Sequence, residues 1–127
     1  MPKKSLAVYV VDDDESICRA LKRLLASVGY QALTFESAED FLDTNLGLKK
    51  GCLVLDVRLP GMTGFDLQEQ LISRGAEISI IFITAHNNPK WQEKAKKRGA
   101  VAYLTKPFHE QALLDAIKQC QQQAEGG

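Results

Sequence analysis

Short apolar runs alternate along this chain with stretches whose apolar residues recur at helical spacing. The runs are rich in β-branched residues and cover 6–11, 32–35, 52–55, 78–83 and 101–104, of which 32–35 is the weakest. Runs that are apolar throughout are typical of strands buried on both faces of a parallel sheet. Because parallel strands need crossover connections, the pattern predicts an α/β fold with a doubly wound, five-stranded parallel sheet.

Residues that commonly start or stop helices mark out the stretches between these runs. Gly29 follows the first helical stripe and is expected to end it. Ser37, Thr63 and Asn88 stand where N-caps of the next three helices are expected. Pro89 suits the first position of a helix. The expected order of elements is therefore a strand followed by a helix, repeated five times.

Apolar spacing also predicts which helical side chains face the core. In the helix after Thr63 these are Phe65, Leu67, Leu71 and Ile72. In the last helix, which is expected to begin at about His109, they are Leu113, Ile117 and Cys120. The fourth helix differs, because five basic residues surround its only apolar side chains, Trp91 and Ala95. It is expected to present a solvated basic face and to be held by little apolar surface.

Composition narrows the class of protein. The 127 residues suffice for one domain, and sixteen basic side chains balance sixteen acidic ones, which predicts no general attraction to nucleic acid or membrane. The longest apolar run is too short to span a bilayer, and no secretory signal is expected at the start.

We expect a domain over 1–120 and a glutamine-rich polar tail or linker start over 121–127. Reduced thiols of a cytoplasmic protein are expected at Cys18, Cys52 and Cys120.

Polar side chains stand where the predicted strands end. Asp12 and Asp13 follow the first strand, Asp56 ends the third, Thr84 ends the fourth and Lys106 follows the fifth. Ligands of doubly wound sheets bind beyond the carboxyl ends of the strands, so we expect these side chains to converge. Crowded carboxylates without histidine favour a hard cation such as Mg²⁺. Lys106 and Thr84 can bind phosphoryl oxygens while Asp56 acts as a carboxylate nucleophile, which predicts phosphoryl transfer.

Each of these residues also has an ordinary structural explanation when taken alone. An acidic run after a strand often begins a helix, and Asp14 and Glu15 fit that role well. A single aspartate or threonine at a strand end is commonly a cap or turn residue, and a Lys-Pro pair is commonly a loop. Four such residues at the ends of four predicted strands favour the functional interpretation.

The same segments resemble those of CheY-like receiver domains of two-component response regulators, over nearly the whole chain. Residues 10–13 (VVDD) resemble the family's acidic pair, and 55–64 (LDVRLPGMTG) resemble its phosphoacceptor loop. Residues 83–85 (ITA) resemble its hydroxyl-then-small pair. Residues 106–108 (KPF) resemble its lysine segment, where the family usually has a cis peptide before proline. The resemblance implies a flavodoxin-like (β/α)5 fold with strand order 2-1-3-4-5.

The resemblance also implies a phosphorylation site and a metal site. Asp56 would be phosphorylated by a sensor histidine kinase in a Mg²⁺-dependent reaction, for which Mn²⁺ can substitute. Asp13 and Asp56 would bind the metal through their side chains. Asp12 would bind it mostly through water, and Arg58 through its backbone carbonyl.

Two further roles are implied around Asp56. Lys106 and Thr84 would be the catalytic residues that bind the phosphoryl oxygens. Thr84 and Tyr103 would form a switch that moves on phosphorylation. An aromatic residue in a strand is also commonly a core residue, so both readings of Tyr103 stay open at this point.

Residues 37–42 and 99–101 resemble the branch of the family whose receivers precede helix-turn-helix transcription domains. The chain would then regulate transcription through such a domain, which these 127 residues do not include, and would contact DNA only through it. The surface rearranged by phosphorylation would be the fourth helix, fifth strand and fifth helix, where receivers of the family often form homodimers. The basic fourth helix departs from that branch, which commonly has more apolar residues there.

The chain is expected to be a signalling switch rather than an enzyme, assisting only its own phosphorylation and dephosphorylation. Three alternatives remain. An aspartate-nucleophile phosphatase would need a second acid where Arg58 stands, and a flavin carrier would need phosphate-binding glycines in the first loop, which is acidic instead. A receiver that acts only through protein contacts is the third, and the unusual fourth helix keeps it open.

Overall fold

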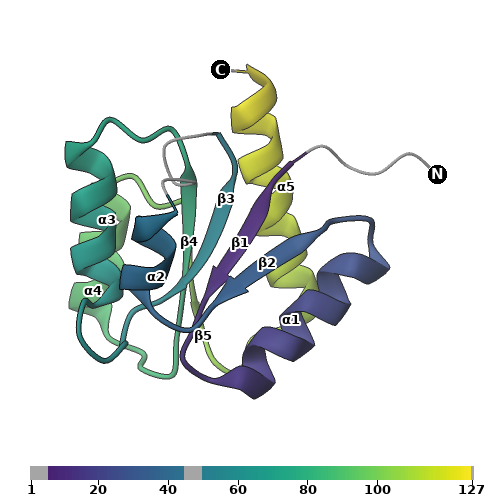
Figure 1. Cartoon of the computed structure of the whole chain (residues 1–127), viewed down its shortest axis with the longest axis horizontal. Coiled ribbons are helices and arrows are strands. Elements are labelled where there is room, and N and C mark those ends of the chain that lie inside the picture. The colour runs from purple at the N-terminus through teal and green to yellow at the C-terminus, as the bar shows by residue number, and fades with distance from the viewer. Residues whose placement is uncertain (1–5, 45–49, 127) are drawn as a thin grey trace.

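The computed structural model describes residues 6–44 and 50–126, and its elements are shown in Figure 1. One parallel sheet has the order β2-β1-β3-β4-β5, which confirms the expected fold and strand order. Its strands are β1 (Val8–Val11), β2 (Ala32–Phe35), β3 (Cys52–Asp56), β4 (Ser79–Thr84) and β5 (Ala102–Thr105). The helices are α1 (Glu15–Ser27), α2 (Ala38–Asp43), α3 (Gly64–Ser73), α4 (Pro89–Lys97) and α5 (Glu110–Gly126).

Helices cover both faces of the sheet, with α1 and α5 on one face and α2, α3 and α4 on the other (Figure 1). Each face has its own apolar core, and the same strands supply both. Val10 and Val54 belong to the core under α1 and α5, whereas their neighbours Val11 and Leu55 belong to the opposite core. Successive strand residues point to opposite faces, so a strand buried on both faces must be apolar throughout. The continuous apolar runs of the sequence have this cause.

The predicted helix caps are present. Ser37 accepts a hydrogen bond from the backbone N–H of Asp40, and Asn88 accepts from the first turn of α4. Thr63 and Asp66 form a reciprocal capping box at the start of α3. Asp14 caps α1, as the structural explanation of the acidic run predicts. These caps fix where the loops after β1, β2, β3 and β4 end.

One predicted core position in α3 is wrong. Ile72 is 53% exposed, whereas Leu67 and Leu71 are buried. Ile72 lies about 100° around the helix from Leu71, near the carboxyl end of α3, and its side chain reaches solvent. Gln68, one turn earlier, is buried instead, and its Oε1 has no hydrogen-bond partner among residues 6–44 and 50–126.

Helix α5 includes most of the glutamine-rich stretch and packs against the sheet. Its predicted core residues Leu113, Ile117 and Cys120 are fully buried. The Tyr30 hydroxyl donates a hydrogen bond to Gln121 Oε1 at 2.8 Å, and the Ser79 hydroxyl donates to Gln123 Oε1 at 2.9 Å. No helix in the described part of the chain is long and apolar enough to cross a bilayer.

Candidate functional site

The parallel register gathers the predicted site residues at one edge of the sheet. The pairing of β1 with β3 places Asp12, the residue after β1, beside Asp56, the last residue of β3. Thr84 ends β4, and its partner in β5 is followed by Lys106. This edge is formed by the carboxyl ends of the strands, where ligands of open α/β sheets bind.

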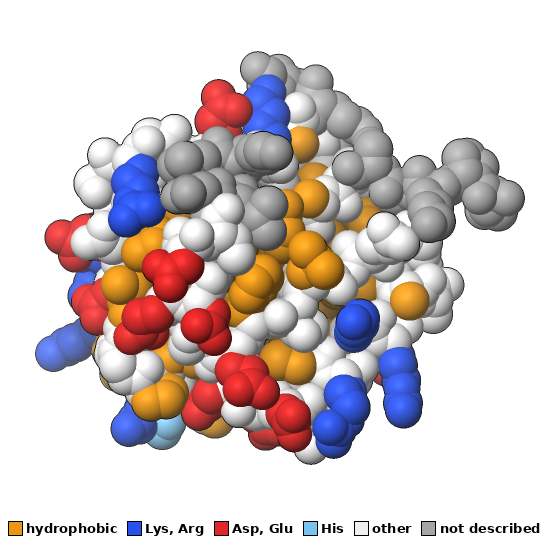
Figure 2. All heavy atoms as spheres, viewed as in Figure 1, with side chains coloured by type: hydrophobic (Ala, Val, Ile, Leu, Met, Phe, Trp, Pro, Cys, Tyr) orange, Lys and Arg blue, Asp and Glu red, His pale blue; other side chains and the backbone are white. Residues whose placement is uncertain are grey.

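Three carboxylates form an acidic cluster at this edge. Asp12, Asp13 and Asp56 each offer an oxygen, and these oxygens lie within 4.8 Å of one another. Asp12 is fully buried and Asp56 is 6% exposed, whereas Asp13 is exposed to solvent. Acidic side chains also gather on the surface over α2 and where β1 leads into α1 (Figure 2). Buried carboxylates this close repel each other unless a cation lies between them.

Lys106 supplies one such cation. Its Nζ lies 2.8 Å from Asp12 Oδ2 and 3.2 Å from Asp56 Oδ2. Burial alone would lower the pKa of Lys106, but its hydrogen bond to Asp12 and the charges of both carboxylates raise it above the ordinary value. Burial, and then the charge of Asp12, raise the pKa of Asp56, although Lys106 and a backbone N–H oppose this rise. The lysine thus offsets the crowding of the carboxylates only in part.

Backbone groups hold the two buried carboxylates in place. The N–H of Arg58 donates to Asp56 Oδ1 at 3.2 Å, and the N–H of Asp14 donates to Asp12 Oδ1 at 2.9 Å. Gly64, the first residue of α3, also lies very close to the backbone of Asp56. A Cβ atom on Gly64 would lie 2.3 Å from the carbonyl oxygen of Asp56, so only glycine fits there without movement.

Thr84 and Tyr103 are joined through the backbone of His86. Thr84 is fully buried, and its hydroxyl oxygen accepts a hydrogen bond from the N–H of His86 at 3.2 Å. The Tyr103 hydroxyl donates to the carbonyl oxygen of His86 at 3.0 Å. Tyr103 is partly exposed, and its hydroxyl is bonded to the loop after β4. These two features distinguish it from an ordinary core aromatic.

No role was predicted for His86 from the sequence. Its Nε2 lies 3.0 Å from Nη1 of Arg58, and its ring packs edge-on against Trp91 with 5.9 Å between centroids. His86 thus bridges the loops after β3 and β4 at the rim of the site. The signal was present, because His86 stands only two residues after Thr84, at a strand end already identified as functional.

The structure brings four of the predicted residues into direct contact or close proximity, namely Asp12, Asp13, Asp56 and Lys106. Thr84 lies at the same edge, and Arg58 and Tyr103 meet at its rim through His86. The peptide between Lys106 and Pro107 is cis, as the resemblance implied. An oxygen-only donor set with a buried carboxylate of raised pKa fits a hard divalent cation. The same carboxylate, beside a lysine, is placed to act as a nucleophile.

Comparison with known proteins gives consistent matches. The family of the response regulator receiver domain matches residues 8–118. The response regulator protein TmoT of Ectopseudomonas mendocina is 43% identical over 118 residues, which cover 93% of this chain and 54% of TmoT. The transcriptional regulatory protein FixJ of Azorhizobium caulinodans is 40% identical over 118 residues, which cover 93% of this chain and 56% of FixJ. The chain thus spans about half the length of these curated relatives.

Solved structures agree with these sequence matches. The response regulator StyR superimposes with a TM-score of 0.88 at 48% identity, over 97% of this chain and 63% of that one. The separate structure named FixJ-N gives a TM-score of 0.85 at 32% identity, over 94% of this chain and 95% of that one.

Proposed function

The chain belongs to the response regulator receiver family of two-component signalling, and on that premise we propose that Asp56 is its phosphoryl acceptor. The observation that carries this proposal is the position of Asp56. Its carboxylate lies at the ligand-binding edge of the sheet, where Lys106 bridges it to Asp12, and one oxygen is held by the N–H of Arg58. Burial and the charge of Asp12 raise the pKa of Asp56, so a cation beside this carboxylate would stabilise its ionised form.

The phosphoryl donor in this proposal is a phosphohistidine of a sensor histidine kinase. An oxygen of Asp56 bonds to phosphorus while the bond from phosphorus to the histidine nitrogen breaks, and that nitrogen keeps the electron pair. Lys106 Nζ, 3.2 Å from Asp56, then binds an oxygen of the transferred group. The buried hydroxyl of Thr84 donates to another of its oxygens.

We assign the acidic cluster to Mg²⁺, with Mn²⁺ as a substitute. Asp13 and Asp56 would bind the ion through their carboxylates, Asp12 mostly through water, and Arg58 through its backbone carbonyl. Such an ion offsets negative charge on the transferring group, which is most of what phosphoryl transfer requires. The oxygen-only donor set and the acidic surroundings of the cluster support this assignment (Figure 2).

Thr84 and Tyr103 form the switch in this proposal. The Thr84 hydroxyl oxygen accepts from the N–H of His86, and Tyr103 is bonded to the carbonyl of the same residue. When Thr84 turns to bind the phosphoryl group, the bond to His86 breaks and the loop that carries the Tyr103 contact is released. The surface of α4, β5 and α5 then changes and pairs two phosphorylated copies. DNA is contacted only through a further domain of the whole protein, and the output is transcription.

Phosphorylation by acetyl phosphate tests the proposal without the kinase. The purified chain is incubated with acetyl phosphate and Mg²⁺, and intact mass is measured for wild type, Asp56→Asn and the control Asp115→Asn, whose exposed carboxylate lies on α5. We expect one phosphate on wild type and on the control, and none on Asp56→Asn or in EDTA. Equal phosphorylation of Asp56→Asn would refute the assignment of the acceptor. Phosphate release should match the decay of the phosphorylated chain, because the chain assists only its own reaction.

A further inference from the structure

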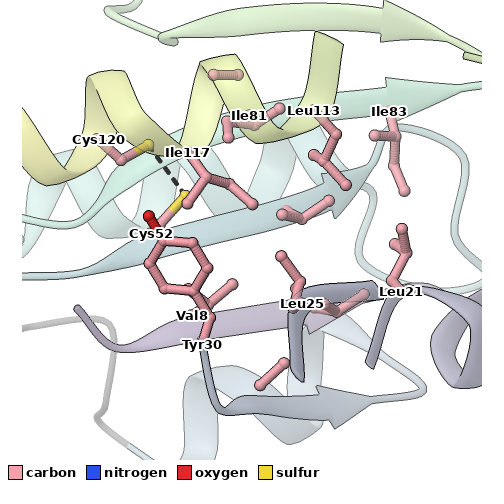
Figure 3. Packing of buried hydrophobic residues seen from close by; sticks show 14 of the residues in the cluster. Val8, Leu21, Leu25, Tyr30, Cys52, Ile81, Ile83, Leu113, Ile117 and Cys120 are labelled. Carbon is pink, nitrogen blue, oxygen red and sulfur yellow. Dashed lines mark hydrogen bonds between the residues drawn. The ribbon is translucent and has the colours of Figure 1, made fainter. Parts of the chain in front are cut away.

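Two buried thiols face each other at the opposite end of strand β3 from Asp56. Cys52 is the first residue of β3, and Cys120 lies in α5, 68 residues further along the chain. Their sulfur atoms are 2.9 Å apart, and Figure 3 shows the two side chains pointing toward each other within the core under α5. The pair lies at the amino-terminal end of β3, whereas the acidic cluster lies at the carboxyl ends of the strands.

The separation of these sulfurs is short enough for a bond to form with little movement. A disulfide needs about 2.05 Å between sulfurs, so the two atoms must approach by about 1 Å. Rotation of two side chains supplies such a shift, because Cys52 and Cys120 come from packed elements that already contact each other. The third cysteine has a different partner, since Cys18 Sγ donates to the carbonyl oxygen of Asp12 at 3.3 Å.

Both sulfurs are shielded while α5 stays docked. Cys52 and Cys120 have no exposed surface. Burial, and then the contact with Cys120, raise the pKa of the Cys52 thiol well above its ordinary value. The thiolate is the reactive form, so oxidation must wait until the end of α5 opens locally.

Hydrogen bonds also attach the end of α5 that would open. Gln121 accepts a hydrogen bond from Tyr30, which follows α1, and Gln123 accepts from Ser79, which begins β4. These bonds join neutral groups, and hydrogen bonds of this kind contribute little to stability. A covalent bond at Cys120 would therefore change the behaviour of this end of the helix far more than either of them.

We propose that Cys52 and Cys120 are a modification site, forming a reversible intramolecular disulfide that fixes the end of α5 to β3. The oxidant is a peroxide or a comparable two-electron oxidant. Each thiol loses one hydrogen, the two sulfurs bond, and a molecule of hydrogen peroxide is reduced to two of water. A dithiol reductant reverses the reaction. The site is independent of Asp56 and adds a second input to the proposed phosphorylation switch.

Oxidation of the whole chain with hydrogen peroxide tests the bond itself. After free thiols are alkylated in denaturant, peptide mass spectrometry locates any disulfide. We expect a loss of two hydrogens, a Cys52–Cys120 linkage and one free thiol, at Cys18. The control Cys18→Ala should form the same linkage, whereas Cys52→Ala and Cys120→Ala should not. A linkage that includes Cys18, or no linkage in folded wild type, would overturn the proposal even if a variant failed to fold.

Hydrogen exchange of the oxidised chain tests what the bond does. Amide exchange in the last turns of α5 should slow several-fold in oxidised wild type and return to its original rate after dithiol treatment. Low urea should speed formation of the bond, because it promotes local opening. Unchanged exchange in α5 after complete oxidation would show that the bond does not fix the helix.

Discussion

The substitution Gly64→Ala separates two physical effects that act in opposite directions. Gly64 is the first residue of α3, and alanine is favoured over glycine in helices by at most about 1 kcal/mol. However, a Cβ atom there would lie 2.3 Å from the carbonyl oxygen of Asp56 and 3.0 Å from Cα of Val57, where ordinary contacts begin at 3.4 Å. The crowded atoms are backbone atoms, which cannot rotate away.

The steric effect should be the larger one. Forcing extra volume against fixed neighbours costs about 3 kcal/mol, near the top of the range for overpacking. We therefore expect Gly64→Ala to lower the free energy of unfolding by about 2 kcal/mol in urea denaturation. Because the strained backbone includes Asp56, its carboxylate should move relative to Lys106, now 3.2 Å away. A misplacement of about 1 Å should slow phosphorylation by acetyl phosphate about 100-fold.

Gly75→Ala is the matched control. Gly75 has a φ of +71° and no atom within 4 Å of an added Cβ, so its substitution introduces backbone strain without crowding the site. It should cost about 1 kcal/mol of stability and leave the phosphorylation rate unchanged. A Gly64→Ala variant as stable as wild type, with the wild-type rate, would refute the claim that this close approach positions Asp56.

Three further changes test the electrostatics and packing. In EDTA, Asp56→Asn should be more stable than wild type at neutral pH. Because the pKa of Asp56 is raised in the folded state, wild type loses stability as pH rises through that pKa. The stability advantage of Asp56→Asn should therefore vanish in acid, which urea midpoints measured across pH would show. Lys106→Met leaves the buried carboxylates of Asp12 and Asp56 without their bonded cation, and should cost about 3 kcal/mol at neutral pH, partly restored by Mg²⁺. Leu71→Ala should cost about 3 kcal/mol, whereas Ile72→Ala should change stability by less than about 0.5 kcal/mol.

Each of these expectations has a clear contrary result. A pH-independent difference between Asp56→Asn and wild type would mean that the carboxylate is not destabilised by burial and by Asp12. A Lys106→Met variant whose stability does not respond to Mg²⁺ would separate the lysine from the proposed metal site. Equal losses for Leu71→Ala and Ile72→Ala would contradict the orientation of α3.

Local features explain how much of the fold the sequence could predict. Strands buried on both faces are apolar throughout, and caps such as Ser37 and Thr63 act within a few residues, so both are visible without a structure. The site was predictable because parallel strands end at one edge, where Asp12, Asp56 and Lys106 had to meet.

The features that the sequence did not reveal depend on contacts between distant segments or on the orientation of side chains around a helix. Ile72 is exposed although it is apolar, and Gln68 is buried although it is polar, so apolar spacing alone does not predict either position in α3. The role of His86 depends on Arg58, which lies 28 residues away. The contact between Cys52 and Cys120 depends on how α5 docks, and apolar patterning predicts only that both are buried.

The position of the phosphoryl group within the wild-type chain decides whether Asp56 is the acceptor. The chain is phosphorylated with acetyl phosphate and Mg²⁺, reduced with borohydride, which converts an aspartyl phosphate into homoserine, and digested for peptide sequencing by mass spectrometry. We expect homoserine at Asp56 and at no other carboxylate, and none in samples that contained EDTA. Homoserine at Asp12 or Asp13, or none at Asp56 in a folded and treated chain, would contradict it.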